Sequence, residues 1–320
     1  MRAPIYCDGH CTRGPAAPPP TPWGSALSNP LTRRGRRGAR AASVAACAVV
    51  LAACSPVGGS VDAAGAGPAA DGGTYLALGD SVPFGYRGGE PAEAYQDPTG
   101  FVGYPQLVGE SLGLDVVNAA CPGETTASFS DVTAQSNGCR NSPTMPAGYR
   151  TAYPLHVDYA APDQSQLEYA VSTLQRIRDV RLVTVQVGAN DAFLCQQSTA
   201  DQCTSAIGTL TGTVQTNLST ILATLRGEGG YDGPIVVVTY YALDYADGTA
   251  AGIQVLDSGI AAAAEANGAV VASGYDAFKP AAAGSAGSST DAGLVLPDDV
   301  HPTEKGQRLL AQAVRAAVPH

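Results

Sequence analysis

The sequence predicts an α/β fold, in which helices cover both faces of a central parallel β-sheet. Two observations support this prediction. From Thr74 onward, short apolar runs alternate with segments of helical periodicity, which is typical of parallel strands joined by helices. Several of these runs end in polar residues, as expected at the carboxyl edge of such a sheet, where functional groups gather.

Five apolar segments have the composition of buried strands, and five others have apolar residues at helical spacing. The expected strands are residues 74–79, 114–120, 181–188, 234–243 and 269–273. The expected helices are residues 103–113, 163–179, 204–227, 252–268 and 304–318. We expect Asp163 to begin the second helix, Asn267-Gly268 to end the fourth and Thr303 to cap the last.

One long connection, residues 126–162, has little periodicity. Long irregular segments in compact domains are usually functional or disordered. Its aromatic residues argue against disorder and favour a wall or lid over a site, although a surface loop of no function is the simpler alternative. These aromatic residues are Phe129, Tyr149, Tyr153 and Tyr159.

The first 53 residues have the layout of an export leader. A basic run around residues 33–40 precedes an apolar segment that is too short to span a bilayer. This segment ends in Leu51-Ala52-Ala53-Cys54, which resembles the lipobox of bacterial lipoproteins, so we expect Cys54 to carry a lipid. The alternative is an ordinary cleaved signal. The leader is long, which favours a start of translation at Leu27 or Leu31 and would leave residues 1–30 untranslated.

Residues 54–73 are expected to form the lipidated cysteine and a flexible linker, and residues 74–320 a single domain. Without the residues before Cys54 the formal charge changes from −10 to −16, because seven of the 18 basic residues but only one of the 28 acidic residues precede it. Such a surface repels phosphate backbones, which argues against nucleic acid as a partner. We expect an exported monomer, secreted or held in the cell envelope, that reaches the membrane only through its lipid.

Four cysteines follow Cys54, and an even number in an exported domain favours disulfides. Three pairings are possible, and the local one closes the shortest loops. We therefore expect Cys121–Cys139 and Cys195–Cys203. Neither a Cys-x-x-Cys spacing nor a histidine cluster is present, so we expect no metal.

The polar residues at the expected strand ends together contain the parts of a serine-hydrolase site. Ser81 follows the first strand, and His301 is the histidine that lies beside suitable acids. An imidazole can take the proton of a serine hydroxyl, and a carboxylate on its other nitrogen fixes the tautomer. We expect Asp298 to be this acid. Its neighbour Asp299 is an alternative.

The negative oxygen of a tetrahedral intermediate needs hydrogen-bond donors. The Ser81 and Gly123 N–H groups and the side-chain amide of Asn190 can supply three, so we expect these residues to form an oxyanion hole. Taken one at a time, each residue has a structural explanation: Gly123 suits a turn, and Asn190-Asp191 suits a helix cap.

The same residues resemble the SGNH, or GDSL-type, hydrolase superfamily, whose members include secreted and lipoprotein bacterial esterases and lipases. The matching blocks are Gly79-Asp80-Ser81 with Gly85, then Gly123, then Gly188-Ala189-Asn190-Asp191, and Asp298-x-x-His301. The first block has Val82 in place of leucine. The resemblance implies a flavodoxin-like three-layer α/β/α sandwich with about five parallel strands. It also implies catalytic Ser81, Asp298 and His301.

The expected function is therefore that of a carboxylic-ester hydrolase, an esterase or lipase without a cofactor that acts on a small-molecule or lipid ester. Within the same family, a carbohydrate O-acetylesterase or an enzyme that transfers the acyl group to an alcohol is an alternative. A non-catalytic cell-envelope lipoprotein that binds glycan or lipid is an alternative of another class, because fold alone does not determine function.

Overall fold

The computed structural model describes residues 72–319, apart from 144 and 146. The predicted leader and the lipidation of Cys54 lie outside the described residues. Five parallel strands form one sheet in the order β2-β1-β3-β4-β5. They are β1 (Thr74–Gly79), β2 (Asp115–Asn118), β3 (Val180–Gln186), β4 (Ile235–Val238) and β5 (Val270–Ala272). This strand order is flavodoxin-like, which confirms the predicted fold.

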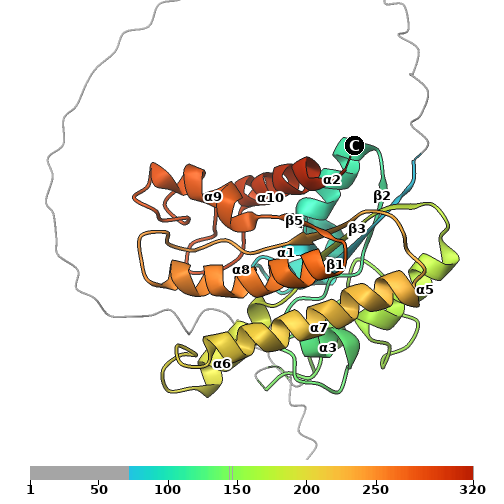
Figure 1. Ribbon diagram of the computed structural model, residues 1–320, viewed down its shortest axis with the longest axis horizontal. Helices are drawn as coiled ribbons and strands as arrows, with labels where there is room; N and C mark the ends of the chain where they lie inside the picture. Colours follow the sequence, from blue (N-terminus) through green and yellow to red (C-terminus); the bar gives the residue numbers. More distant parts are fainter. Residues whose placement is uncertain (1–71, 144, 146, 320) are drawn as a thin grey trace, which may run out of the picture.

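Helices cover both faces of the sheet (Figure 1). The longer ones are α2 (Tyr104–Leu112), α5 (Gln166–Arg176), α6 (Ala189–Ser198), α7 (Ile207–Gly227), α8 (Thr249–Ala266), α9 (Gly274–Ala283) and α10 (Glu304–Ala317). Short helical segments are α1 (Ser81–Phe84), η1 (Ala94–Gln96), η2 (Pro98–Gly100), α3 (Thr126–Ser130) and α4 (Tyr149–Ala152). Helices α2, α9 and α10 lie together, and α5, α7 and α8 form the other layer.

The continuous apolar runs in the sequence explain the core. In β1, Tyr75, Leu76, Ala77 and Leu78 are fully buried, as are most residues of β3 and β4. Both faces of these strands are therefore covered, as expected for a parallel sheet. Among the described residues, no helix has the length and apolarity needed to cross a bilayer.

The helices differ in several places from the sequence-based expectations. Helix α6, at residues 189–198, was not predicted. The helix expected from Asp163 begins later, because the Ser165 side chain accepts a hydrogen bond from the Glu168 N–H and the Glu168 side chain accepts one from the Ser165 N–H. Helix α9 was not predicted, since Pro280 lies inside it. Thr303 caps α10 as predicted: its hydroxyl accepts from the Gly306 N–H.

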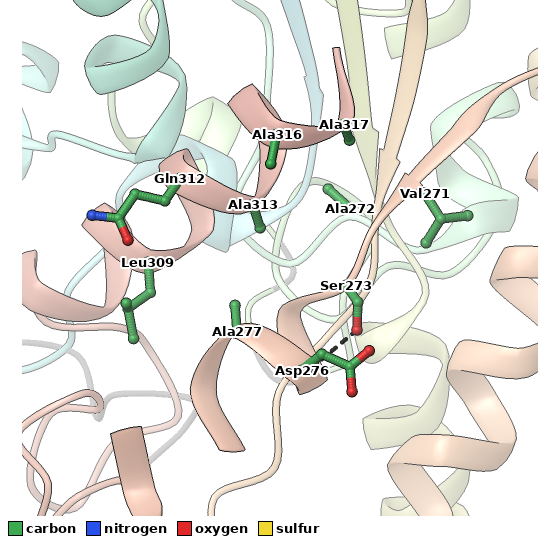
Figure 2. A pocket seen from close by; sticks show the side chains of 10 residues that line it. All are labelled: Val271, Ala272, Ser273, Asp276, Ala277, Leu309, Gln312, Ala313, Ala316 and Ala317. Atoms are coloured by element: carbon green, nitrogen blue, oxygen red, sulfur yellow. Dashed lines mark hydrogen bonds between the residues drawn. The ribbon is translucent and has the colours of Figure 1, made fainter. Parts of the chain in front are cut away.

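A groove of about 500 Å³ opens at the β5 edge of the sheet, between α9 and α10 (Figure 2). Its lining is mostly small and apolar, with Ser273 and Asp276 on one side. It contains none of the residues expected to carry the chemistry. The functional site must therefore be sought at the carboxyl ends of the central strands.

The structure contains both expected disulfides, Cys121–Cys139 and Cys195–Cys203. The first connects the loop after β2 to the irregular segment 126–162, and its two cysteines are buried. The second joins α6 to the turn that precedes α7. Each bond therefore restricts a loop beside the carboxyl edge of the sheet.

A buried side-chain amide connects two loops at this edge. Gln166 accepts from the Gly79 N–H at 2.5 Å, donates to the Gly79 carbonyl at 3.0 Å and donates to Glu124 Oε2 at 2.9 Å. Ser128 Oγ donates to Glu124 Oε1 at 2.5 Å. Burial raises the pKa of Glu124 to about 7, although these two hydrogen bonds partly oppose the shift. Glu124 therefore belongs to the structural core, although its side chain is an acid.

We expect loss of a disulfide to destabilise the domain. Replacing Cys121 and Cys139 together by alanine should lower the free energy of unfolding by about 3 kcal/mol, because the unfolded chain regains the freedom of a loop of 18 residues. The eight-residue loop of Cys195–Cys203 should contribute slightly less. Urea unfolding of each double variant measures these values. Identical melting curves with and without reductant, together with four free thiols, would contradict the expectation.

We also expect Glu124 to make stability depend on pH. Since its native pKa is raised, the native state keeps a proton that the unfolded chain releases, and stability falls as pH rises from about 4.5 to about 7. One such group contributes at most about 1.4 kcal/mol per pH unit. Glu124→Gln can still accept from Gln166 and can donate to Ser128 Oγ, and it should show a shallower decline in urea unfolding across this window. Glu110→Gln, on the exposed side of α2, is the control. Equal slopes for wild type and Glu124→Gln would refute the assignment.

Candidate active site

Ser81 lies where β1 ends and α1 begins. The preceding Gly79 has φ +138°, and a Cβ there would meet the Gln186 carbonyl oxygen at 2.0 Å, so only glycine fits. Asp80 caps α1 by accepting from the Val82 N–H at 3.0 Å. The Tyr240 hydroxyl donates to the other oxygen of Asp80 at 2.5 Å. This turn holds Ser81 at the carboxyl edge of the sheet.

His301 comes from the far end of the chain, in the loop before α10. Its Nε2 lies 2.9 Å from Ser81 Oγ, and its Nδ1 lies 2.6 Å from Asp299 Oδ1. The Ser81 residue is 4% exposed and His301 is 1% exposed, so their hydrogen bond is shielded from water. The serine hydroxyl, the imidazole and a carboxylate thus form one hydrogen-bonded series.

Asp299 is held by more than the imidazole. The backbone N–H of Gly88 donates to Oδ2 at 2.9 Å, and that of Val300 donates to Oδ1 at 2.7 Å. Burial alone would raise the pKa of Asp299, but the hydrogen bond and charge of His301 and the two backbone N–H groups lower it to about 2. The group is therefore a carboxylate at neutral pH.

The structure corrects the prediction that Asp298 contacts the histidine. The chain reverses between Val295 and Pro302, which pair as an antiparallel bridge, and Asp298 lies in this turn with φ +56°. Its side chain is exposed, whereas the next residue, Asp299, lies beneath the turn against the imidazole. The left-handed conformation at Asp298 turns its side chain away from His301, so the three-residue spacing in the sequence does not lead to a contact.

Aromatic residues form a wall beside the histidine. The Tyr86 ring meets the His301 ring edge-on, with centroids 4.8 Å apart. Tyr149, from the irregular segment, packs against Tyr86 and Phe84 with centroids 5.8 and 5.4 Å apart. The segment 126–162 is thus packed against the site at Tyr149, as expected of a wall.

Gly123 and Asn190 come from two other loops at the same edge. Gly123 has φ +86°, and a Cβ there would lie 2.5 Å from the Cα of Gly138. Asn190, in the first turn of α6, donates from Nδ2 to the Glu124 carbonyl at 3.0 Å. The Cys121 N–H donates to the Gly79 carbonyl at 3.0 Å, which connects the Gly123 loop to the serine loop. The structure therefore brings the expected oxyanion residues to the edge that carries Ser81.

The backbone N–H groups of Ser81 and Gly123 have no hydrogen-bond acceptor among the described residues 72–143, 145 and 147–319. The Asn190 amide has a second N–H besides the one directed at Glu124. Three donors are thus available to an added ligand oxygen.

Sequence analysis missed one polar residue at this edge. Asn137 donates from Nδ2 to Asn190 Oδ1 at 3.1 Å and lies two residues before Cys139. Its segment has no periodicity that would indicate a packed face. The one sequence feature that could have placed Asn137 near the site is its position two residues before Cys139.

A metal does not fit the one cluster of metal-ligating atoms in the described part of the chain. Ligand atoms of Cys121, Glu124 and Cys139 lie within 4.8 Å of one another. Both sulfurs are used in the disulfide, so neither is a thiolate.

The chain matches a known family. The model of the GDSL-like Lipase/Acylhydrolase family matches residues 77–309. A phospholipase A1 from Streptomyces albidoflavus NA297 has 19% identity over 77% of this chain and 100% of its own, with a TM-score of 0.51. An acetylxylan esterase from Geobacillus stearothermophilus has 15% identity over 78% of this chain and 95% of its own, with a TM-score of 0.50.

These two likenesses concern the fold, and no curated protein sequence matches the chain. The family match covers most of the chain, from β1 to α10, and includes Ser81 and His301. The chain therefore belongs to the GDSL-like lipase/acylhydrolase family and is a carboxylic-ester hydrolase.

Proposed function

We propose that the protein cleaves carboxylic esters through an acyl-serine intermediate on Ser81. The observation that carries the proposal is the series Ser81 Oγ, His301 and Asp299, with separations of 2.9 and 2.6 Å. These distances allow the imidazole to take the serine proton as the hydroxyl attacks.

In the first half-reaction, Ser81 Oγ bonds to the ester carbonyl carbon and its proton passes to His301 Nε2. Asp299 accepts a hydrogen bond from the Nδ1–H group and, as a carboxylate, stabilises the imidazolium. The tetrahedral intermediate collapses when the alcohol leaves with the proton from Nε2. In the second half, His301 takes a proton from water, the resulting hydroxide attacks the acyl-serine, and Nε2 returns the proton to Ser81 as the acid leaves.

The negative oxygen of each tetrahedral intermediate would be bound by Ser81 N–H, Gly123 N–H and Asn190 Nδ2. Loss of one such donor typically costs about 2.7–4 kcal/mol of transition-state stabilisation. Two backbone donors and one amide suffice for this chemistry, so the proposed reaction has no step that needs a cofactor.

The two structural neighbours suggest two substrate classes, acyl lipids and acetylated polysaccharides. A lipid anchor at Cys54 would favour acyl lipids, because it would hold the enzyme at a membrane. We propose an exported monomer. The two disulfides support export, since such bonds persist in oxidising compartments.

The first prediction concerns the nucleophile. We expect Ser81→Ala to abolish turnover of p-nitrophenyl esters, because Ser81 Oγ is the hydroxyl that His301 Nε2 contacts and that would take the acyl group from the ester. The assay uses the domain from Thr74 and esters from acetyl to long acyl chains. Turnover that survives in the variant would exclude Ser81. Absence of turnover in the parent, with no phosphonate on Ser81, would favour the binding lipoprotein.

The second prediction separates the two neighbouring acids. Asp299→Asn should lower kcat at least about 100-fold, because the amide cannot stabilise the imidazolium as a carboxylate does. Asp298→Asn, at the exposed tip of the turn, should change kcat less than about twofold. Measured kcat values for both variants at one neutral pH decide between them. The reverse pattern would restore Asp298 as the acid.

A further inference from the structure

The segment that carries Asn137 covers the Gly123 loop. The Asn137 N–H donates to the Gly123 carbonyl at 2.8 Å, and Gly138 lies against the Cα of Gly123. The Cys121–Cys139 disulfide joins the same two segments, because Cys121 lies two residues before Gly123 and Cys139 two residues after Asn137. The Asn137 side chain is therefore fixed relative to one proposed oxyanion donor through its own backbone.

The same side chain bridges two turns of α6. Asn137 Nδ2 donates to Asn190 Oδ1 at 3.1 Å, and Asn137 Oδ1 accepts from Gln197 Nε2 at 3.4 Å. Asn190 and Gln197 are seven residues apart, about two turns, and so share one face of the helix. Asn137 and Asn190 are 2% and 1% exposed, so the bond between them is shielded from water, whereas the longer bond from the exposed Gln197 is only partly buried.

The direction of these bonds determines which end of the Asn190 amide faces the site. Its NH₂ group donates to the Glu124 carbonyl at 3.0 Å and its oxygen accepts from Asn137 at 3.1 Å, so both contacts favour one orientation, in which one N–H remains for a ligand oxygen. A rotated amide would set its oxygen against the Glu124 carbonyl and would present an acceptor where a donor is needed. Two buried acceptors in contact are strongly unfavourable.

We propose that Asn137 is a positioning residue that holds the Asn190 amide in the donor orientation for the oxyanion. The inference rests on the proposed acyl-serine reaction. Asn137 touches no reacting atom. Its effect passes through Asn190, and Gln197 orients Asn137 in turn.

Two substitutions at Asn137 test this. Asn137→Ala removes the donor to Asn190 Oδ1 and should lower kcat about tenfold with little change in KM. Asn137→Asp places an acceptor against Asn190 Oδ1 and favours the rotated amide, so its kcat should fall further, toward the loss of about 10²–10³-fold expected for Asn190→Ala. Asn141→Ala, in the same loop with an exposed side chain, should keep the parent kcat.

A double-mutant cycle separates positioning from a general effect on the loop. If Asn137 acts through Asn190, adding Asn137→Ala to Asn190→Ala should cause no further loss of kcat. Additive losses would overturn the inference. Gln197→Ala provides a milder disturbance in case the Asn137 variants do not fold. It should lower kcat a few-fold. An unchanged kcat would count against the series of hydrogen bonds from Gln197 through Asn137 to Asn190.

The outcomes also distinguish this inference from the proposed function. Full kcat in Asn137→Ala and Asn137→Asp, with a large loss in Asn190→Ala, would overturn the role of Asn137 and leave the reaction intact. Full kcat in Asn190→Ala would overturn both the amide donor and its positioning. Turnover that is independent of Ser81 would overturn the proposed function, and the inference with it.

Discussion

The hydrogen bond between His301 Nε2 and Ser81 Oγ joins residues that are 220 positions apart, and the fold has to hold both to within a fraction of an ångström. Gln307 on α10 contributes directly to this alignment: its side chain accepts from the Tyr104 N–H at 2.8 Å and donates to the Val82 carbonyl at 3.0 Å. Helix α10, which follows the histidine loop, is thus attached to α1, which begins at Ser81, and to the first residue of α2. The Tyr241 hydroxyl adds a bond to the Val300 carbonyl at 2.7 Å.

Two carboxyl groups lie near the serine, Asp80 beside it in the chain and Asp299 behind His301, and their surroundings give them different pKa values. Asp299 receives hydrogen bonds from an imidazole and two backbone N–H groups, and its pKa lies near 2 in spite of burial. Burial raises the pKa of Asp80 to about 6, and the hydrogen bonds from Tyr240 and Val82 only moderate that rise. Asp299 is therefore suited to stabilise an imidazolium, whereas Asp80 is better understood as the cap that shapes the serine turn.

The sheet was predictable from the sequence because its strands are buried on both faces and read as continuous apolar runs. The strand ends were predictable for the same reason, and with them the placement of Ser81, Gly123 and Asn190 in loops at one edge of the sheet. Helix α9 was not, because Pro280 interrupts its pattern. The acid was assigned to Asp298 instead of Asp299 because the choice depends on one left-handed residue in a turn, and residue type alone does not predict that an aspartate adopts φ +56°.

Asn137 lay beyond sequence-based prediction for a more general reason. Periodicity reveals residues that pack on a regular face, but Asn137 acts from an irregular segment whose path depends on a disulfide and on backbone contacts with Gly123. Such a segment can place a polar side chain against α6 without any repeating pattern. The carboxyl edge of the sheet supplies donors at predictable positions. The orientation of an amide donor, however, depends on hydrogen bonds from outside the sheet, and at Asn190 one of these comes from Asn137, in the least regular part of the domain.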